Sequence, residues 1–213
     1  MIITAIRKIL TNVLNALYPP FFFAICLTVF IMLSYMSAEK IGWKRLVQKF
    51  IRRIQSDSEF FKLSIFVFYS VMILFRTLFN RGFWTNPTSN VIGVWGFYNE
   101  KGEFTTEIIE NTLLFIPFTA LLLSLIRKNY NKIKYNQNSK TKNFKIQRII
   151  YYSVIYSFCV SLAIETLQLV FRLGTFQLSD LFFNTLGGLI GGICYRIICF
   201  FDIPNKNEQR RKK

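Results

Sequence analysis

Five apolar stretches in this chain approach the length needed to cross a bilayer. They lie near residues 20–37, 61–79, 111–127, 149–171 and 181–201. A helix rises 1.5 Å per residue, so about 20 apolar residues span the hydrocarbon core. Hydrophobic residues make up 52% of the 213-residue chain, more than a soluble domain of this size can bury. The sequence therefore predicts an all-α integral membrane protein, a bundle of about five transmembrane helices.

The segments that flank these stretches predict the domain organisation. Residues 1–19 contain Arg7 and Lys8 ahead of apolar residues, but polar residues interrupt that apolar run and no small-residue cleavage pattern follows. We expect residues 1–19 to form an interfacial amphipathic segment. Residues 20–201 would then form the transmembrane domain, and residues 202–213 a basic cytoplasmic tail.

Charge predicts the orientation of the helices. Segment 38–62 has seven basic residues against three acids, and segment 127–148 has eight basic residues and no acid. By the positive-inside rule, both segments face the cytoplasm. Segment 80–110 has more acids than bases, so we expect this segment and the short turn 172–180 to lie outside. The N-terminus is then outside and the C-terminus cytoplasmic.

The formal net charge of +16 does not by itself indicate a nucleic-acid partner. The basic residues are concentrated in the segments that face the cytoplasmic leaflet, where anionic lipids attract polybasic segments. We therefore expect membrane lipid as a partner and no nucleic acid. The four cysteines all lie within apolar stretches, without a Cys-x-x-Cys pair or any histidine to complete a metal site.

Polar residues within the apolar stretches are the candidate ligand-binding residues. A carboxylate at the middle of a membrane helix costs about 2.5–3.5 kcal/mol, so a helix that keeps one is expected to use it. The predicted topology brings seven such residues to the outer leaflet, with Glu165 about 9 Å below the boundary. They are Arg76, Asn111, Glu165, Gln168, Arg172, Asp180 and Asn184. Spacings of three and four residues predict that Glu165, Gln168 and Arg172 share one helix face.

These residues lie in a pattern that resembles the VanZ-like family. The pattern comprises the run from Ser161 to Gly192, the Asn111 to Phe118 segment and Arg76, and it covers about residues 61–200. The resemblance implies a multi-pass protein of the bacterial cytoplasmic membrane, related to the teicoplanin-resistance protein. Members of that family raise resistance to glycopeptide or lipoglycopeptide antibiotics.

The chain also departs from the family pattern in the turn before Asp180. The family turn is usually richer in acid, whereas this chain has Gln177 and Ser179, and Thr119 stands where a glycine often follows the Pro-Phe pair. A metal site built from paired carboxylates would be impaired here. We therefore predict no metal site, and we expect no cofactor.

Each candidate residue also has a structural interpretation. Glu165 could form an ion pair with Arg76 or Arg172 that fixes helix register. Pro117 could bend its helix or open a kink that exposes a carbonyl to a head group. Four glycines form two overlapping Gly-xxx-Gly patterns, which predict close helix packing or a dimer interface and leave the oligomeric state open. They are Gly187, Gly188, Gly191 and Gly192.

Three functions remain compatible with the sequence. We favour a resistance factor that binds an amphiphile, either a lipoglycopeptide or a lipid-linked cell-wall precursor, with Arg76 and Arg172 holding an anionic group that Glu165 and Gln168 help to orient. The second is an enzyme with Glu165 or Asp180 as general acid or base, for which no clear nucleophile is apparent. The third is a small carrier or flippase, although a continuous polar path across the bilayer is hard to draw.

Overall fold

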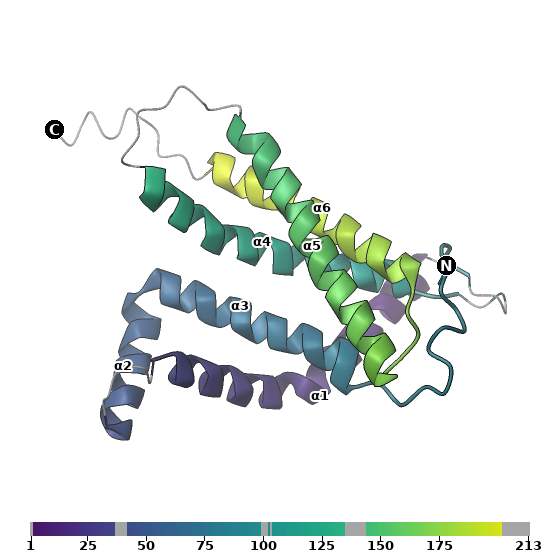
Figure 1. The fold of residues 1–213 in the computed structure, drawn as a ribbon, viewed down its shortest axis with the longest axis horizontal. Coiled ribbons are helices and arrows are strands. Elements are labelled where there is room, and N and C mark those ends of the chain that lie inside the picture. The colour runs from purple at the N-terminus through teal and green to yellow at the C-terminus, as the bar shows by residue number, and fades with distance from the viewer. Residues whose placement is uncertain (1, 37–41, 99–101, 103, 135–143, 202–213) are drawn as a thin grey trace.

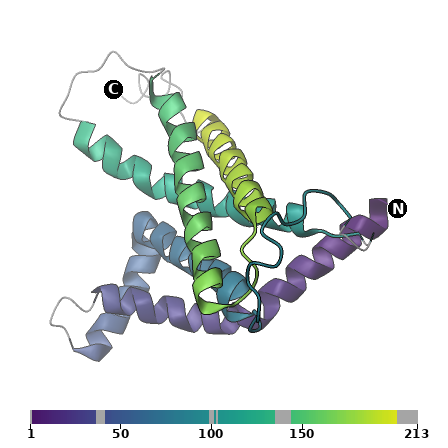
Figure 2. The same cartoon turned by 45° about the vertical axis from the view of Figure 1, so that its right-hand side comes forward.

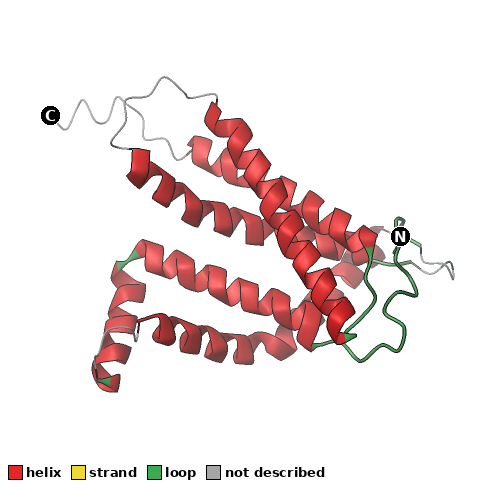
Figure 3. Ribbon diagram, in the orientation of Figure 1, coloured by secondary structure: helices red, strands yellow, loops and turns green. Residues whose placement is uncertain are grey.

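The structure is a computed structural model that describes residues 2–36, 42–98, 102, 104–134 and 144–201. Its helices are α1 (Ile2–Met36), α2 (Trp43–Ser56), α3 (Ser58–Leu74), the π-helix η1 (Phe75–Phe79), α4 (Glu107–Lys134), α5 (Phe144–Phe171) and α6 (Leu178–Phe201). The described residues form no β-strand (Figure 3). The prediction of an all-α fold is confirmed.

Four helices are long and apolar enough to cross a membrane, and a fifth apolar segment is shorter. The four are Ser58–Phe79, Glu107–Ile126, Arg148–Phe171 and Leu178–Cys199, and the shorter segment is Pro20–Met36 within α1. Large apolar side chains on these helices are exposed, as expected of surfaces that face lipid. The prediction of about five membrane helices is therefore confirmed.

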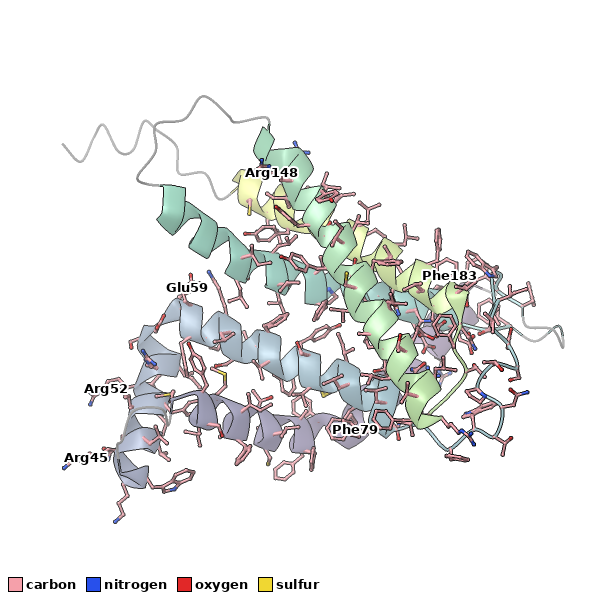
Figure 4. The ribbon with its side chains drawn as sticks, viewed as in Figure 1. Arg45, Arg52, Glu59, Phe79, Arg148 and Phe183 are labelled. Carbon is pink, nitrogen blue, oxygen red and sulfur yellow. The ribbon has the colours of Figure 1, made fainter. Side chains whose placement is uncertain are left out.

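The bundle has two chemically different ends (Figures 1 and 4). The basic end comprises α2 and the ends of the spans near Glu59 and Arg148. The loop end comprises the described residues of the connection 80–106 between η1 and α4, and the turn 172–177 between α5 and α6. The first helix, α1, begins at the loop end, as Figure 2 also shows.

Helix α6 lies between α4 and α5 and contacts both, because its glycines leave no side chain in the way (Figure 1). A Cβ atom at Gly187 would lie 2.2 Å from the carbonyl oxygen of Thr112 on α4. A Cβ atom at Gly188 would lie 2.0 Å from Oγ of Ser157 on α5. Gly191 and Gly192 repeat the two contacts one turn further along α6. The four glycines therefore lie at helix contacts within the bundle.

Apolar clusters join the other helices. Ile73 of α3 packs with Phe115 and Phe118 of α4 and with Ile164 of α5. Helix α4 continues through Pro117 without ending there.

Several expected boundaries differ from the structure. Segment 38–62 was expected only as a cytoplasmic connection, but it contains helix α2 and the start of α3. Segment 127–148 was likewise expected only as a cytoplasmic connection, but α4 extends to Lys134 and α5 begins at Phe144. Residues 2–19 are helical and continuous with the first span, while their interfacial position stays a prediction. The expected basic tail, residues 202–213, lies outside the described residues.

Candidate functional site

A polar cavity of about 300 Å³ lies at the loop end of the bundle. Its lining residues come from η1 and the residues that follow it, from the first turns of α4, and from the start of α6. They are Arg76, Thr77, Asn80, Arg81, Glu107, Glu110, Asn111, Gln177 and Asp180. Phe79 and Phe183, labelled in Figure 4, mark this end of the molecule. The cavity therefore gathers charged side chains from segments that are far apart in the sequence.

An ion pair between Arg76 and Glu110 forms one wall of the polar cavity. A guanidinium nitrogen of Arg76 contacts one carboxylate oxygen of Glu110, and the hydroxyl of Thr106 donates to the other. The two charged side chains are only 20% and 13% exposed. A charge-assisted pair of this kind is stronger than a neutral hydrogen bond, so it fixes η1 against α4. The partner of Arg76 is thus Glu110, whereas the sequence suggested an ion pair of Glu165 with Arg76 or Arg172 as one structural alternative.

A second polar bridge joins α4 to α6. The side-chain amide of Asn111 donates to Oδ1 of Asp180 over 2.7 Å. Asp180 lies in the first turn of α6, where the positive end of the helix dipole stabilises a carboxylate. These two residues were predicted to converge on one site, and the structure places both in the lining of the polar cavity.

Glu165 and Gln168 lie behind the polar cavity, and neither belongs to its lining. Each is only 1% exposed. Oε2 of Glu165 accepts the backbone N–H of Gln177 over 2.9 Å, and Gln177 itself lines the cavity. The side-chain amide of Gln168 donates to the carbonyl of Thr77 over 2.8 Å, a group at the end of η1 that has no helical partner. Both residues support the cavity wall from within α5.

Arg172 lies outside the polar cavity, which corrects the expectation that it shares a face with Glu165 and Gln168. Its φ angle is +53°, so the backbone leaves the helical path at this residue. The side chain is exposed, and its guanidinium lies 5.9 Å from the ring centroid of Phe83. Its carbonyl accepts the backbone N–H of Trp84 over 2.8 Å. Arg172 therefore contacts the connection between η1 and α4.

Arg81 is the cavity residue that the sequence reasoning missed. It was counted only as a charge in the connection 80–106, yet it lines the polar cavity together with Arg76. The last turn before it is a π-type turn, in which the N–H of Asn80 donates to the carbonyl of Phe75 over 2.9 Å. Residues five apart lie on different faces of an α-helix, so the spacing of Arg76 and Arg81 gave no signal that both face one cavity. The π-type turn, which the sequence does not reveal, brings them together.

The connection 80–106 packs against the turn between α5 and α6. The N–H of Phe176 donates to the carbonyl of Pro87 over 3.0 Å, and the N–H of Leu178 donates to the carbonyl of Val91 over 2.8 Å. Gly174, with φ +155°, leaves room for Arg81, because a Cβ atom there would lie 2.9 Å from Nη1 of that arginine. The two segments thus hold the cavity residues in place from outside the bundle.

Asn184 has a packing contact away from the polar cavity. Its side-chain amide donates to the hydroxyl of Ser161 over 2.9 Å, so it joins α6 to α5. Both residues are buried, Asn184 at 4% and Ser161 at 0% exposure. Of the seven predicted ligand-binding residues, the lining thus includes Arg76, Asn111 and Asp180, whereas Asn184 lies among the helix contacts.

Comparison with known proteins identifies the family. The VanZ/LLP1 family model matches residues 20–199, a range that contains the whole lining of the polar cavity. The chain is also similar to Protein VanZ of Enterococcus faecium, with 24% identity over 152 residues, which cover 68% of this chain and 75% of that protein. No solved structure matches the chain. The chain therefore belongs to the VanZ/LLP1 family.

Proposed function

We propose that this chain lowers the susceptibility of its host to glycopeptide or lipoglycopeptide antibiotics by binding an amphiphile. The polar cavity would hold the head group, either of the antibiotic or of a lipid-linked cell-wall precursor, and so reduce the access of the drug to its target. The observation that carries this proposal is the mixed-charge cavity at the end of membrane-spanning helices. A charged head group can enter such a site while its apolar part stays in the bilayer.

The distribution of charge supports an outward-facing cavity in the bacterial cytoplasmic membrane. Helix α2 has five basic residues and no acid, and it lies at the basic end. By the positive-inside rule this end belongs in the cytoplasm. The loop end, with Glu107 and Glu110 in the first turn of α4, would then face outward, where antibiotics and translocated precursors are found.

The charges of the lining suggest which head groups fit. Two arginines stand against three carboxylates, so the lining has one formal negative charge in excess. Arg76 is already paired with Glu110. The remaining groups, Arg81 opposite Asp180 and Glu107, suit a head group that contains an ammonium as well as an anionic group. A plain phosphate, held by two arginines as the sequence suggested, is a poorer match.

The two other functions have less support in the geometry. Of the two candidate acid/base residues, Glu165 is buried behind the lining and bonded to a backbone amide. Asp180 does line the cavity, but the hydroxyl among the lining residues, that of Thr77, donates to the carbonyl of Ile73 and not to a carboxylate base. A carrier would need a polar path through the bundle. Deeper between α3 and α5 the next hollow, of about 190 Å³, is lined almost entirely by apolar residues such as Ile73, Phe118 and Ile164.

Replacement of Asp180 by Asn tests the proposal. The amide can keep the bond from Asn111 but removes the charge that faces the cavity. In a sensitive Gram-positive host, we expect Asp180→Asn to lower the minimum inhibitory concentration of teicoplanin-type drugs toward that of cells without the protein. Glu59→Gln at the basic end makes the same chemical change and should keep wild-type resistance at matched membrane levels.

Two outcomes would contradict this proposal. If Asp180→Asn and Glu59→Gln gave the same resistance as the wild type, the cavity charge would have no role. If mass spectrometry of lipids and precursors found a new covalent product that depends on the protein, the function would be enzymatic.

A further inference from the structure

Helix α2 combines a high basic charge with a position across the basic end of the bundle. It contains Lys44, Arg45, Lys49, Arg52 and Arg53 and no acidic residue. Figure 1 shows that α2 runs across the ends of α1 and α3. Because α3 crosses the membrane, a helix that lies across its end lies close to the plane of the bilayer surface. The polar cavity lies at the opposite end of the bundle, so α2 does not contact a ligand bound there.

One face of α2 packs on the protein. Leu46 is only 3% exposed and belongs to a cluster with Met32 and Met36 of α1 and Phe60 of α3. Phe50 and Ile54, one and two turns further along, pack against the same cluster. The apolar positions thus follow the helical period, and they fix how α2 is rotated about its axis.

A single residue joins α2 to α3 and holds the angle between them. Asp57 ends α2 and caps the N-terminus of α3, because its carboxylate accepts the backbone N–H groups of Glu59 and Phe60 over 3.0 Å and 3.3 Å. Arg53 also packs over the ring of Phe60, 5.5 Å from its centroid. The position of α2 across the bundle is therefore built into the fold.

The side of α2 turned away from the bundle is exposed and basic. Lys44, Arg45 and Arg52 are exposed, and Figure 4 shows Arg45 and Arg52 pointing away from the bundle. Trp43 lies three residues before Leu46, so it continues the packed side at the free end of α2. Trp43 and Ile51 are 66% and 51% exposed. Tryptophan is enriched at the level of lipid head groups, and basic side chains with apolar neighbours are typical of helices that lie in this interface.

We propose that helix α2 is a binding surface for anionic phospholipid head groups. Lys44, Arg45 and Arg52 reach the phosphates from the aqueous side of the helix, while Trp43, on the side turned toward the bilayer, enters the boundary between head groups and acyl chains. Each basic residue near an anionic membrane surface strengthens binding to that surface by about fivefold. The same lipids would stabilise the α1–α3 pair, because α2 contacts both helices.

A nucleic acid is the other polyanion that could fit a basic helix. It is disfavoured because the exposed Trp43 and Ile51 lie on a helix that rests against the ends of membrane spans, where phosphates of lipid are already at hand. Nucleic-acid binding would also leave Trp43 outside the acyl region. The depth of Trp43 in the bilayer therefore distinguishes the two partners.

Fluorescence quenching by brominated lipid tests the proposal on the full chain. The protein has three tryptophans, so Trp84→Phe with Trp95→Phe leaves Trp43 as the only one. In vesicles of phosphatidylcholine with a minor fraction of phosphatidylglycerol, we expect brominated phosphatidylglycerol to quench Trp43 several-fold more than the same fraction of brominated phosphatidylcholine. The preference should disappear in the Lys44→Gln, Arg45→Gln, Arg52→Gln variant, and at high salt without any substitution in α2.

Trp95, at the loop end, is the matched control. A variant with Trp43→Phe and Trp84→Phe keeps Trp95 as the only tryptophan, and its quenching should not depend on the three basic residues of α2. The emission maximum of Trp95 in this variant also reports whether the triple variant is folded, because Trp95 packs on Phe182 and Phe183. Equal quenching of Trp43 by the two brominated lipids would overturn the proposal. Absence of quenching by both would place α2 outside the bilayer and would favour a soluble polyanion instead.

Discussion

Arg81 and Arg172 are both arginines at the loop end of the bundle, and only Arg81 lines the polar cavity. If the cavity binds a head group with an anionic part, Arg81→Ala removes a charge-assisted hydrogen bond worth about 1.5–3 kcal/mol. Ligand binding should then weaken about tenfold or more. We expect Arg81→Ala to lose most of the resistance that the wild-type protein confers, measured as the minimum inhibitory concentration at matched expression.

Arg172→Ala is the matched control for this prediction, because it removes the same charge from an exposed position over Phe83. It should keep most of the resistance. A larger loss with Arg172→Ala than with Arg81→Ala would contradict the assignment of the cavity as the binding site. It would instead favour the face that the sequence alone suggested.

The same residues show what the sequence could predict about the site. Arg76, Asn111 and Asp180 were expected to converge because each lies at the end of an apolar stretch, and the structure brings them together. Arg172 was misplaced because a helical spacing was assumed beyond Phe171, where the backbone turns to positive φ. No periodicity rule can show in advance at which residue a helix ends, so such an error is expected at helix termini.

At the scale of helices, contact between α5 and α6 depends on the absence of side chains. Gly188 lies against Ser157, whose Oγ and Cβ atoms would be 2.0 Å and 2.3 Å from a Cβ atom at position 188. We expect Gly188→Ala to lower the free energy of unfolding by about 1–3 kcal/mol, as overpacking does in other cores. Ser157→Gly removes both of these contacts, so the double variant should recover part of the loss. Thermal unfolding in detergent measures both effects.

Gly187→Ala provides the control for the helix contact. Its added Cβ atom would lie 2.2 Å from the backbone carbonyl of Thr112 on α4, on the other side of α6. Ser157→Gly should therefore not rescue Gly187→Ala. Equal rescue of the two alanine variants would mean that Ser157→Gly acts on general stability and not on this contact.

Helix α2 shows why a helix can be overlooked in a sequence dominated by charge. The segment 38–62 was interpreted through its count of basic residues, which indicated a cytoplasmic connection. The positions of Leu46, Phe50 and Ile54, four residues apart, contain the helical period that reveals an amphipathic helix. Their burial against α1 and α3 could not be read from the sequence, because it depends on the angle that Asp57 sets between α2 and α3.

For the whole molecule, the strongest sequence signal was the number and length of the apolar stretches. It was sufficient to predict an all-helical membrane bundle, because a backbone in lipid must satisfy its own hydrogen bonds. The way in which α6 fits between α4 and α5 was only suggested by the Gly-xxx-Gly patterns, since these patterns also occur at dimer interfaces. The packing of the connection 80–106 against the turn 172–177 depends on backbone hydrogen bonds that have no sequence signature.

The orientation of the whole molecule decides whether the polar cavity can meet an antibiotic, and it can be tested with two single cysteines. A cysteine-free background is obtained by replacing Cys26, Cys159, Cys194 and Cys199 with serine. Thr85→Cys then marks the loop end and Gln55→Cys the basic end, both at exposed positions. Because the basic residues concentrate on α2, we expect a membrane-impermeant maleimide to label Thr85→Cys in intact cells and Gln55→Cys only after permeabilisation. The opposite pattern would place the cavity in the cytoplasm, where a drug that acts outside the cell could not reach it. Labelling of both in intact cells would mean that no bilayer separates the two ends.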